Sequence, residues 1–311
     1  MNPVRDEDVM TIPTADEQST EAPAVLPISN GMKYFDAHTH VQFVAYDTDR
    51  EETIQRAKDA EVIMNVVGTQ KDTSAAAVAL ADKYDHIWAS VGLHPIHTSK
   101  SYHDEKEFGS DGKAFTSRGE QFDIANYKAL AENPRTIAIG ECGLDYYRLE
   151  AETKRLQEET FIAQIELANM VNKPLMLHIR PSVAEAMAGK NAYDDALAIL
   201  KREAKIRGDV HFFAGDWTIA KKFLDLGFTL SFTGVLTFTH DYDEVIRNAP
   251  LDMLLSETDA PYIAPVPFRG KRNESAHIPL VVEKIAAIRN EDPETVRTQI
   301  LANAQRVFGV S

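Results

Sequence analysis

Histidine and carboxylate side chains follow short apolar runs along this chain of 311 residues. The first example is the segment 36–40, Asp-Ala-His-Thr-His, in which one residue separates two histidines. Side chains alternate along an extended backbone, so we expect His38 and His40 on the same side, where they could ligate one cation. The His-x-His spacing alone is not specific for metal binding.

Four more candidate ligands accompany other apolar runs, namely Glu141, His178, His211 and Asp259. Glu141 ends the run Ala-Ile-Gly-Glu, and a charged carboxylate after so apolar a segment requires a partner. Taken singly, each of these residues is better explained as a hydrogen-bonded polar group near the core. The whole set is best explained by a metal site, provided that the fold brings the ends of the runs together.

Short β-rich runs alternate with longer amphipathic stretches after residue 33. The runs that predict strands are 34–37, 62–67, 87–92, 136–141, 175–178, 210–213, 229–232 and 253–257. The stretches that predict helices include 51–60, 74–84, 152–172, 193–206, 219–226 and 242–248, and two more helices are expected after the last strand. Eight such units in about 280 residues fit an α/β protein of the (β/α)8 TIM-barrel class, for which roughly 250 residues is typical. An open, doubly wound sheet is the alternative, because a count of strands does not show closure.

A barrel would place all the candidate ligands on one face, because the carboxyl ends of its strands open on the same side. Glu257, two residues before Asp259, is expected to share its face, where it either orients a ligand histidine or only adds polarity to the pocket. Cys142 follows Glu141 in the same strand, so it is expected to point the other way, into the helix layer, as a small buried hydrophobe.

The first 31 residues differ in composition from the rest of the chain. They hold six acidic side chains, one Arg and no aromatic residue. This composition predicts a disordered acidic extension, and residues 32–311 are expected to form one barrel domain. Residues 97–123 make a connection longer than a plain βα loop, and loops of such length are usually functional or mobile.

The overall composition restricts the function. Lys and Arg number 33 against 48 Asp and Glu, and the net charge of −15 opposes binding along a nucleic-acid backbone, so any attraction must be local. The single cysteine excludes an internal disulfide and a thiolate cluster. No apolar run approaches roughly 18 residues and no secretory pattern opens the chain, which predicts a cytoplasmic protein with no membrane association.

Six motifs, in order along the chain, carry a family resemblance. They are Asp-Ala-His-Thr-His at 36–40, Val-Gly-Leu-His-Pro at 91–95, Gly-Glu-Cys-Gly-Leu-Asp-Tyr-Tyr at 140–147, His-Ile-Arg at 178–180, His-Phe-Phe-Ala-Gly at 211–215 and Glu-Thr-Asp-Ala-Pro-Tyr at 257–262. With these motifs the chain resembles the TatD family of metal-dependent hydrolases, deoxyribonucleases of the amidohydrolase-like barrel superfamily. The resemblance extends from about residue 33 to residue 309. Departures after His178 and after His211 could reshape the substrate pocket, but they remove no ligand.

The resemblance implies two divalent metal ions. Mg²⁺ is the family expectation, and Mn²⁺, Zn²⁺ or Ni²⁺ also suit ligands without thiolate. The implied ligands are His38, His40 and Asp259 on one ion, His178 and His211 on the other, and Glu141 bridging the two.

Two such ions would lower the pKa of a bound water, so that hydroxide could attack phosphorus near neutral pH. Asp259 is the candidate base for that water, and His94 is the candidate for contacting the phosphate or protonating the leaving oxygen. Arg148 and Arg269 are candidate cations for the substrate, with solvated surface as the alternative. Tyr146 is a candidate ring for base stacking, with packing over the barrel rim as the alternative.

The leading hypothesis is a deoxyribonuclease or exonuclease that acts on single-stranded DNA, with no membrane and no obligate protein partner. A second hypothesis keeps the two metals and changes the bond to an amide, a lactone or a phosphotriester. Related barrels often bridge their metals with a modified lysine, whereas Glu141 occupies that motif here, which favours the nuclease. The third hypothesis, a catalytically silent binding barrel, predicts missing ligands, and none is missing.

Overall fold

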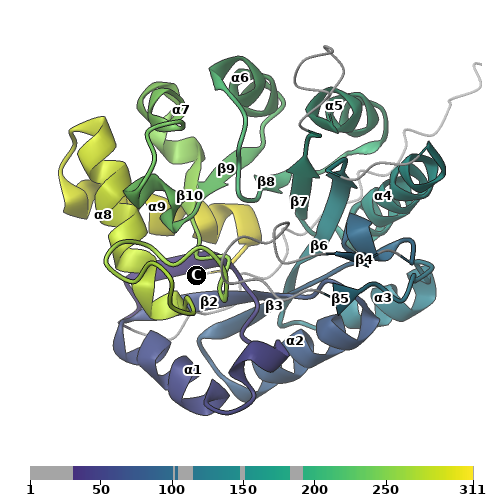
Figure 1. Cartoon of the computed structure of the whole chain (residues 1–311), viewed down its shortest axis with the longest axis horizontal. Helices are drawn as coiled ribbons and strands as arrows, with labels where there is room; N and C mark the ends of the chain where they lie inside the picture. Colours follow the sequence, from purple (N-terminus) through teal and green to yellow (C-terminus); the bar gives the residue numbers. More distant parts are fainter. Residues whose placement is uncertain (1–30, 101, 104–114, 148–150, 183–191, 311) are drawn as a thin grey trace, which may run out of the picture.

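Eight parallel strands curve into a barrel in the computed structural model of the chain, which describes residues 31–100, 102–103, 115–147, 151–182 and 192–310 (Figure 1). The barrel strands are β1 (Tyr34–Thr39), β2 (Val62–Val67), β3 (Ile87–Val91), β6 (Thr136–Asp145), β7 (Leu175–Arg180), β8 (Gly208–Val210), β9 (Thr229–Phe232) and β10 (Leu254–Ser256). All eight predicted strands are confirmed. The observed bounds differ from the predicted ones near the candidate ligands. Strands β6 and β7 continue past Glu141 and His178, whereas β8 ends one residue before His211.

Contacts between the first and last strands bring the two edges of the sheet together. The strand order is β1-β2-β3-β6-β7-β8-β9-β10, with parallel pairing between neighbours. Thr39 and Ala260 form a parallel bridge, the backbone N–H of His40 donates to the carbonyl of Ala260 at 2.7 Å, and that of Asp259 donates to the carbonyl of His38 at 2.9 Å. This seam confirms the barrel and excludes the open sheet. It also brings the first motif, at 36–40, beside the last one, at 257–262.

Helices surround the strands, as Figure 1 shows. They are α1 (Arg50–Asp59), α2 (Lys71–Lys83), α3 (Ile124–Ala131), α4 (Ala151–Val171), α5 (Ala192–Glu203), α6 (Trp217–Asp225), α7 (Asp243–Asn248), α8 (Ile278–Arg289) and α9 (Pro293–Phe308). Aspartates cap several of them, because a side-chain oxygen accepts from backbone N–H groups that have no partner in the first turn. Asp123 caps α3 in this way and Asp216 caps α6. Helix α3 is not among the stretches predicted from the sequence. None of the helices in the described part of the chain is both long and apolar enough to cross a membrane.

Two apolar clusters fill the barrel and its surroundings. The larger one lies between the strands and the helices and contains Cys142, as predicted. The smaller one fills the amino-terminal end of the barrel, where Phe35 stacks on Phe308 of α9 with ring centroids 5.5 Å apart. Because α9 closes that end with apolar side chains, the buried polar groups gather at the opposite end, where the strands finish.

The long connection after β3 contains two short strands among its described residues. Its two sides pair as the short antiparallel strands β4 (Tyr102–His103) and β5 (Phe115–Thr116), and its end leads into α3. Residues 1–30, which make up nearly all of the predicted acidic extension, lie outside the described residues.

Candidate metal centre

Four buried side chains direct ligand atoms at one point near the seam of the barrel. The Nε2 atoms of His38 and His40 lie 3.1 Å apart. Glu141 Oε2 lies 3.4 Å and 3.7 Å from these two nitrogens, and Asp259 Oδ1 lies 3.9 Å and 3.5 Å from them. Metal–ligand bonds of about 2.0–2.2 Å in a tetrahedron separate the ligand atoms by roughly 3.3–3.6 Å. The spacing therefore fits a divalent cation.

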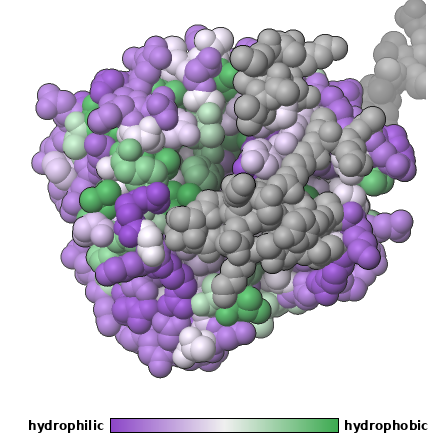
Figure 2. Space-filling model, viewed as in Figure 1, coloured by the Kyte–Doolittle hydropathy of each residue, from purple (hydrophilic) through white to green (hydrophobic). Residues whose placement is uncertain are grey.

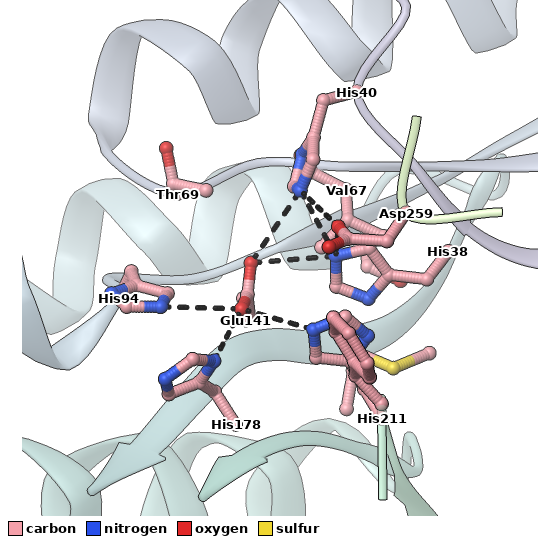
Figure 3. A network of polar contacts seen from close by, with 12 residues as sticks. His38, His40, Val67, Thr69, His94, Glu141, His178, His211 and Asp259 are labelled. Atoms are coloured by element: carbon pink, nitrogen blue, oxygen red, sulfur yellow. Dashed lines mark hydrogen bonds and ion pairs between the residues drawn. The ribbon is translucent and has the colours of Figure 1, made fainter. Parts of the chain in front are cut away.

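A second cluster surrounds the other oxygen of the same glutamate. Glu141 Oε1 lies 2.9 Å from His178 Nδ1, 3.5 Å from His211 Nε2 and 3.2 Å from His94 Nε2. Figure 3 shows these side chains arranged around Glu141, which comes from the middle of β6. One carboxylate thus presents one oxygen to each cluster, which is the geometry of a bridging ligand.

Three histidines are oriented by a contact at the ring nitrogen that faces away from the two clusters. The Nδ1 atom of His40 lies 2.8 Å from the carbonyl oxygen of Val67 and therefore carries a hydrogen, which leaves the Nε2 lone pair facing the first cluster. His211 Nδ1 lies 3.0 Å from Glu257 Oε1, so Glu257 contacts a candidate ligand histidine. Carboxylates and carbonyls in this position select the tautomer that binds metal.

Asp145 provides the third such contact and was not predicted. Its Oδ2 atom lies 2.9 Å from His178 Nε2, so that the other ring nitrogen faces Glu141. The signal was present in the sequence, because Glu141 and Asp145 are four residues apart in one strand and share a face.

Negative charge exceeds positive charge in this buried site. Burial alone would raise the pKa of Glu141, but His94 and His38 outweigh it and hold that pKa well below its ordinary value. Burial lowers the pKa of His38 to about 4, with His211 adding to the effect, so His38 is a neutral imidazole with a lone pair to donate. Burial would also lower the pKa of His211, but Glu257 and Glu141 raise it to about 10. Divalent cations would balance the negative charge of these carboxylates, and the nitrogen and oxygen donors present fit such ions.

The backbone around Glu141 and Asp259 is unusual. A Cβ on Gly140 would lie 2.3 Å from the carbonyl oxygen of Met176, so only glycine fits directly before Glu141. Asp259 has a positive φ of 51°. The loop is held by Thr258, whose backbone N–H and hydroxyl both donate to Asp36 at 2.8 Å and 2.6 Å. Asp36, the first residue of the segment Asp-Ala-His-Thr-His, thus fixes the loop that presents Asp259.

The candidate substrate residues His94, Arg148 and Arg269 differ in their position relative to the metal centre. His94 is buried in the site, and its Nδ1 accepts from the N–H of Ile96 at 3.2 Å, so the hydrogen sits on the Nε2 that faces Glu141. Arg148 lies outside the described residues. Arg269 is exposed, with its guanidinium carbon 3.7 Å from the ring centroid of Phe238.

Tyr146 corrects a prediction. Its side chain is only 1% exposed, and its hydroxyl donates to Asp195 of α5 at 3.0 Å, so its ring is not open to a base. The reason is that β6 runs on to Asp145, which turns the next side chain into the helix layer. Tyr147 is half-buried instead and lies under the guanidinium of Arg180, 4.0 Å from the ring centroid.

Replacing Glu257 with glutamine is expected to weaken metal binding by about 10–100-fold, because a neutral amide, unlike the carboxylate, does not fix which ring nitrogen of His211 carries the hydrogen. The Mn²⁺ concentration for half-maximal activity measures this effect. Glu283→Gln, an exposed change on α8, is the matched control. Equal metal affinity in both variants would contradict the role of Glu257.

A second carboxylate lies behind Glu257. The hydroxyl of Ser231 lies 2.6 Å from Asp209 Oδ2 and 2.7 Å from Glu257 Oε2, although it has one hydrogen to donate. Both contacts are hydrogen bonds only if one carboxyl group is protonated. Burial raises the pKa of Asp209 from 3.8 to about 7, with Glu257 adding to the rise, so Asp209 is the group that holds the proton.

This arrangement makes the stability of the metal-free protein depend on pH. At a pH between 3.8 and about 7, the ordinary and folded pKa values of Asp209, this side chain is protonated in the folded state and ionised in the unfolded chain. The contribution of Asp209 to the free energy of unfolding is therefore complete below about pH 4 and is lost as the pH rises through about 7. Asparagine resembles the protonated form. In EDTA, Asp209→Asn is therefore expected to lose less free energy of unfolding between pH 5 and pH 8 than the wild type, by a few kcal/mol. Urea unfolding measures this, with the exposed Asp252→Asn as control; parallel pH profiles for wild type and Asp209→Asn would refute it.

The fold and the site together define a metal-dependent hydrolase built on a parallel barrel. The chain belongs to the TatD related DNase family, whose sequence model matches residues 35–309.

Individual relatives agree with this assignment. The uncharacterized metal-dependent hydrolase YabD of Bacillus subtilis is 36% identical over 282 residues, which cover 89% of this chain and 99% of that protein. A protein of Erwinia billingiae named 3'-5' ssDNA/RNA exonuclease TatD is 32% identical over 285 residues, 88% of this chain and 98% of its own. Among solved structures, the TatD homologue YJJV of Escherichia coli K12 superposes with a TM-score of 0.74 at 26% identity, and the match covers 90% of this chain and 99% of that one.

Proposed function

We propose that this protein is a nuclease that hydrolyses phosphodiester bonds of single-stranded DNA with the help of two divalent cations, removing nucleotides from an end of the strand. The observation that carries the proposal is the division of Glu141 between two clusters, with Oε2 beside His38 and His40 and Oε1 beside His178 and His211. The name of the Erwinia billingiae relative supports the choice of substrate.

The six ligands divide into two sets in this proposal: His38, His40 and Asp259 in one, His178 and His211 in the other, and Glu141 in both. Divalent cations bound there would supply Lewis acidity toward the phosphate and lower the pKa of an attacking water. Mg²⁺ is the expected ion, and Mn²⁺, Zn²⁺ and Ni²⁺ are compatible with the nitrogen and oxygen donors.

Two residues of the chain are proposed to handle protons. Asp259 is buried next to His38 and His40, and a carboxylate in this position accepts the proton of the attacking water. His94 carries its hydrogen on the Nε2 that points at the centre of the site, so it can donate to a phosphate oxygen or to the leaving oxygen.

The test uses single-stranded DNA labelled at its 3′ end or at its 5′ end, incubated with Mg²⁺, with Mn²⁺ and with EDTA, with RNA of the same sequence as a third substrate. We expect metal-dependent release of nucleotides by the wild type and none by Glu141→Ala, and the label that is released first gives the direction. If the folded, metal-loaded protein cleaves none of these substrates, the proposal is wrong and the same site acts on another hydrolysable bond.

A further inference from the structure

Two neighbouring loops at the carboxyl-terminal face of the barrel expose apolar side chains. Phe238, in the loop after β9, is 42% exposed, and Val266, in the loop after β10, is 47% exposed. A hydrogen bond of 2.9 Å from the N–H of Val266 to the hydroxyl of Thr237 ties the two loops together. Figure 2 shows apolar side chains gathered on this part of the face. Isolated exposed apolar residues need no explanation, but a joined pair beside a catalytic mouth does.

A cation lies on this patch. The guanidinium of Arg269 stands over the ring of Phe238, 3.7 Å from its centroid, and Arg269 is itself exposed. In the part of the chain that the structure describes, no carboxylate forms an ion pair with Arg269. Arg272, three residues later, is different, because it is paired with Asp49 at 2.6 Å. Lys271, two residues after Arg269, is also exposed and forms no ion pair among the described residues, so the loop offers two cations to an anion, and Arg269 is the one that lies on the apolar patch.

The loop that carries Arg269 also carries Asp259, ten residues earlier, and it is held firmly. The side-chain amide of Asn273 donates to the carbonyl of Thr258 at 2.9 Å and to that of Tyr262 at 2.8 Å. The N–H of Tyr262 donates in turn to the carbonyl of Asp259 at 2.9 Å. Val266, Arg269 and the candidate ligand Asp259 thus belong to one braced loop, to which the loop of Phe238 is tied through Thr237, and both loops lie on the face where the strands end.

We infer that Phe238, Val266 and Arg269 form a platform for a nucleobase of the strand whose end lies at the metal centre. The inference rests on the proposed nuclease function and specifies how its substrate is held. A base stacks on a guanidinium plane or on an aromatic ring without regard to its identity, and the arginine charge attracts the adjoining phosphate. The platform explains why an acidic protein keeps on an exposed ring an arginine that has no ion pair among the described residues, and it predicts binding of single strands rather than base-paired ones.

The test compares Arg269→Ala and Phe238→Ala with two controls that make the same kinds of change elsewhere. Met170→Ala removes a side chain that is 50% exposed on α4, and Lys205→Ala removes an exposed cation between α5 and β8, on the opposite face. Binding is measured by the fluorescence anisotropy of a labelled oligothymidylate in Ca²⁺, and turnover is measured on the same oligonucleotide in Mg²⁺. Hydrolysis of bis(p-nitrophenyl) phosphate, which has one phosphodiester and no nucleobase, reports on the intact site.

For each rim variant we expect the dissociation constant and the KM for the oligonucleotide to rise about tenfold, as stacking losses do, while the small phosphodiester is hydrolysed within twofold of the wild-type rate. The controls should match the wild type in every assay. Unchanged oligonucleotide binding in the rim variants, or no binding by the wild type, overturns the platform. If the wild type binds the oligonucleotide without cleaving it and the rim variants bind it more weakly, the platform stands and the proposed nuclease function fails.

Discussion

Glu141→Gln is expected to lower the rate of phosphodiester hydrolysis by at least about three orders of magnitude, the largest effect of any single change in this site. Both oxygens of Glu141 are in use, one beside His38 Nε2 at 3.4 Å and the other beside His178 Nδ1 at 2.9 Å. Glutamine keeps the size but presents a neutral amide, whose nitrogen cannot ligate a cation. Both clusters therefore lose a charged ligand in one substitution.

The measurements are turnover of single-stranded DNA and bound metal after dialysis against Mn²⁺. Glu166→Gln, an exposed change on α4, is the control and should behave as the wild type. Thermal unfolding of the metal-free proteins shows whether the variant folds. A folded Glu141→Gln protein that keeps its metal content and a rate within tenfold of the wild type would refute the shared role of this residue.

Gly143→Ala is expected to destabilise the protein by a few kcal/mol and to remove most of its activity. Gly143 has a φ of 142°, and a Cβ there would lie 2.1 Å from the carbonyl oxygen of His178. The strand β6 would have to move away from β7, and this movement separates Glu141 from the imidazole that it contacts. Stability and ligand geometry are affected together because Gly143 lies where β6 packs closely against β7, and each of these strands carries a candidate ligand.

Urea unfolding and the rate of hydrolysis measure the two effects. Gly270→Ala is the matched control, because Gly270 also has a positive φ, 75°, but has open space where the Cβ would be. That control isolates the backbone cost, about 1 kcal/mol, from the steric one. Equal destabilisation by the two substitutions would show that close approach of β6 and β7 is not what requires glycine at position 143.

The barrel could be predicted from the sequence because the relevant signals are local. Eight β-rich runs separated by amphipathic stretches determine the order of elements, and ligands at the ends of those runs indicate the face on which they meet. Asp259 lies far from His38 and His40 in sequence but close to them in space, since β1 and β10 meet at the seam. The family resemblance adds the division of ligands between two ions, which remains a proposal.

Other features depended on information that periodicity does not contain. The spacing of Asp145 from Glu141 places both on one face, but its contact with His178 depends on which nitrogen of that ring faces inward, and a side-chain rotamer decides that. The burial of Tyr146 depends on how far β6 extends beyond Glu141. The hydrogen bonds of Asp36 to Thr258 join residues 222 positions apart, and only the closed barrel brings them together.

The most direct test of the two-cation site is a count of bound metal. Apoprotein is dialysed against Mn²⁺, and the bound ions are counted by elemental analysis and examined by electron paramagnetic resonance. We predict two ions per chain with a spin-coupled spectrum, since one carboxylate would join them, and loss of the coupling in Glu141→Gln. A single ion per chain, or two uncoupled ions in the wild type, would contradict a site in which Glu141 binds both.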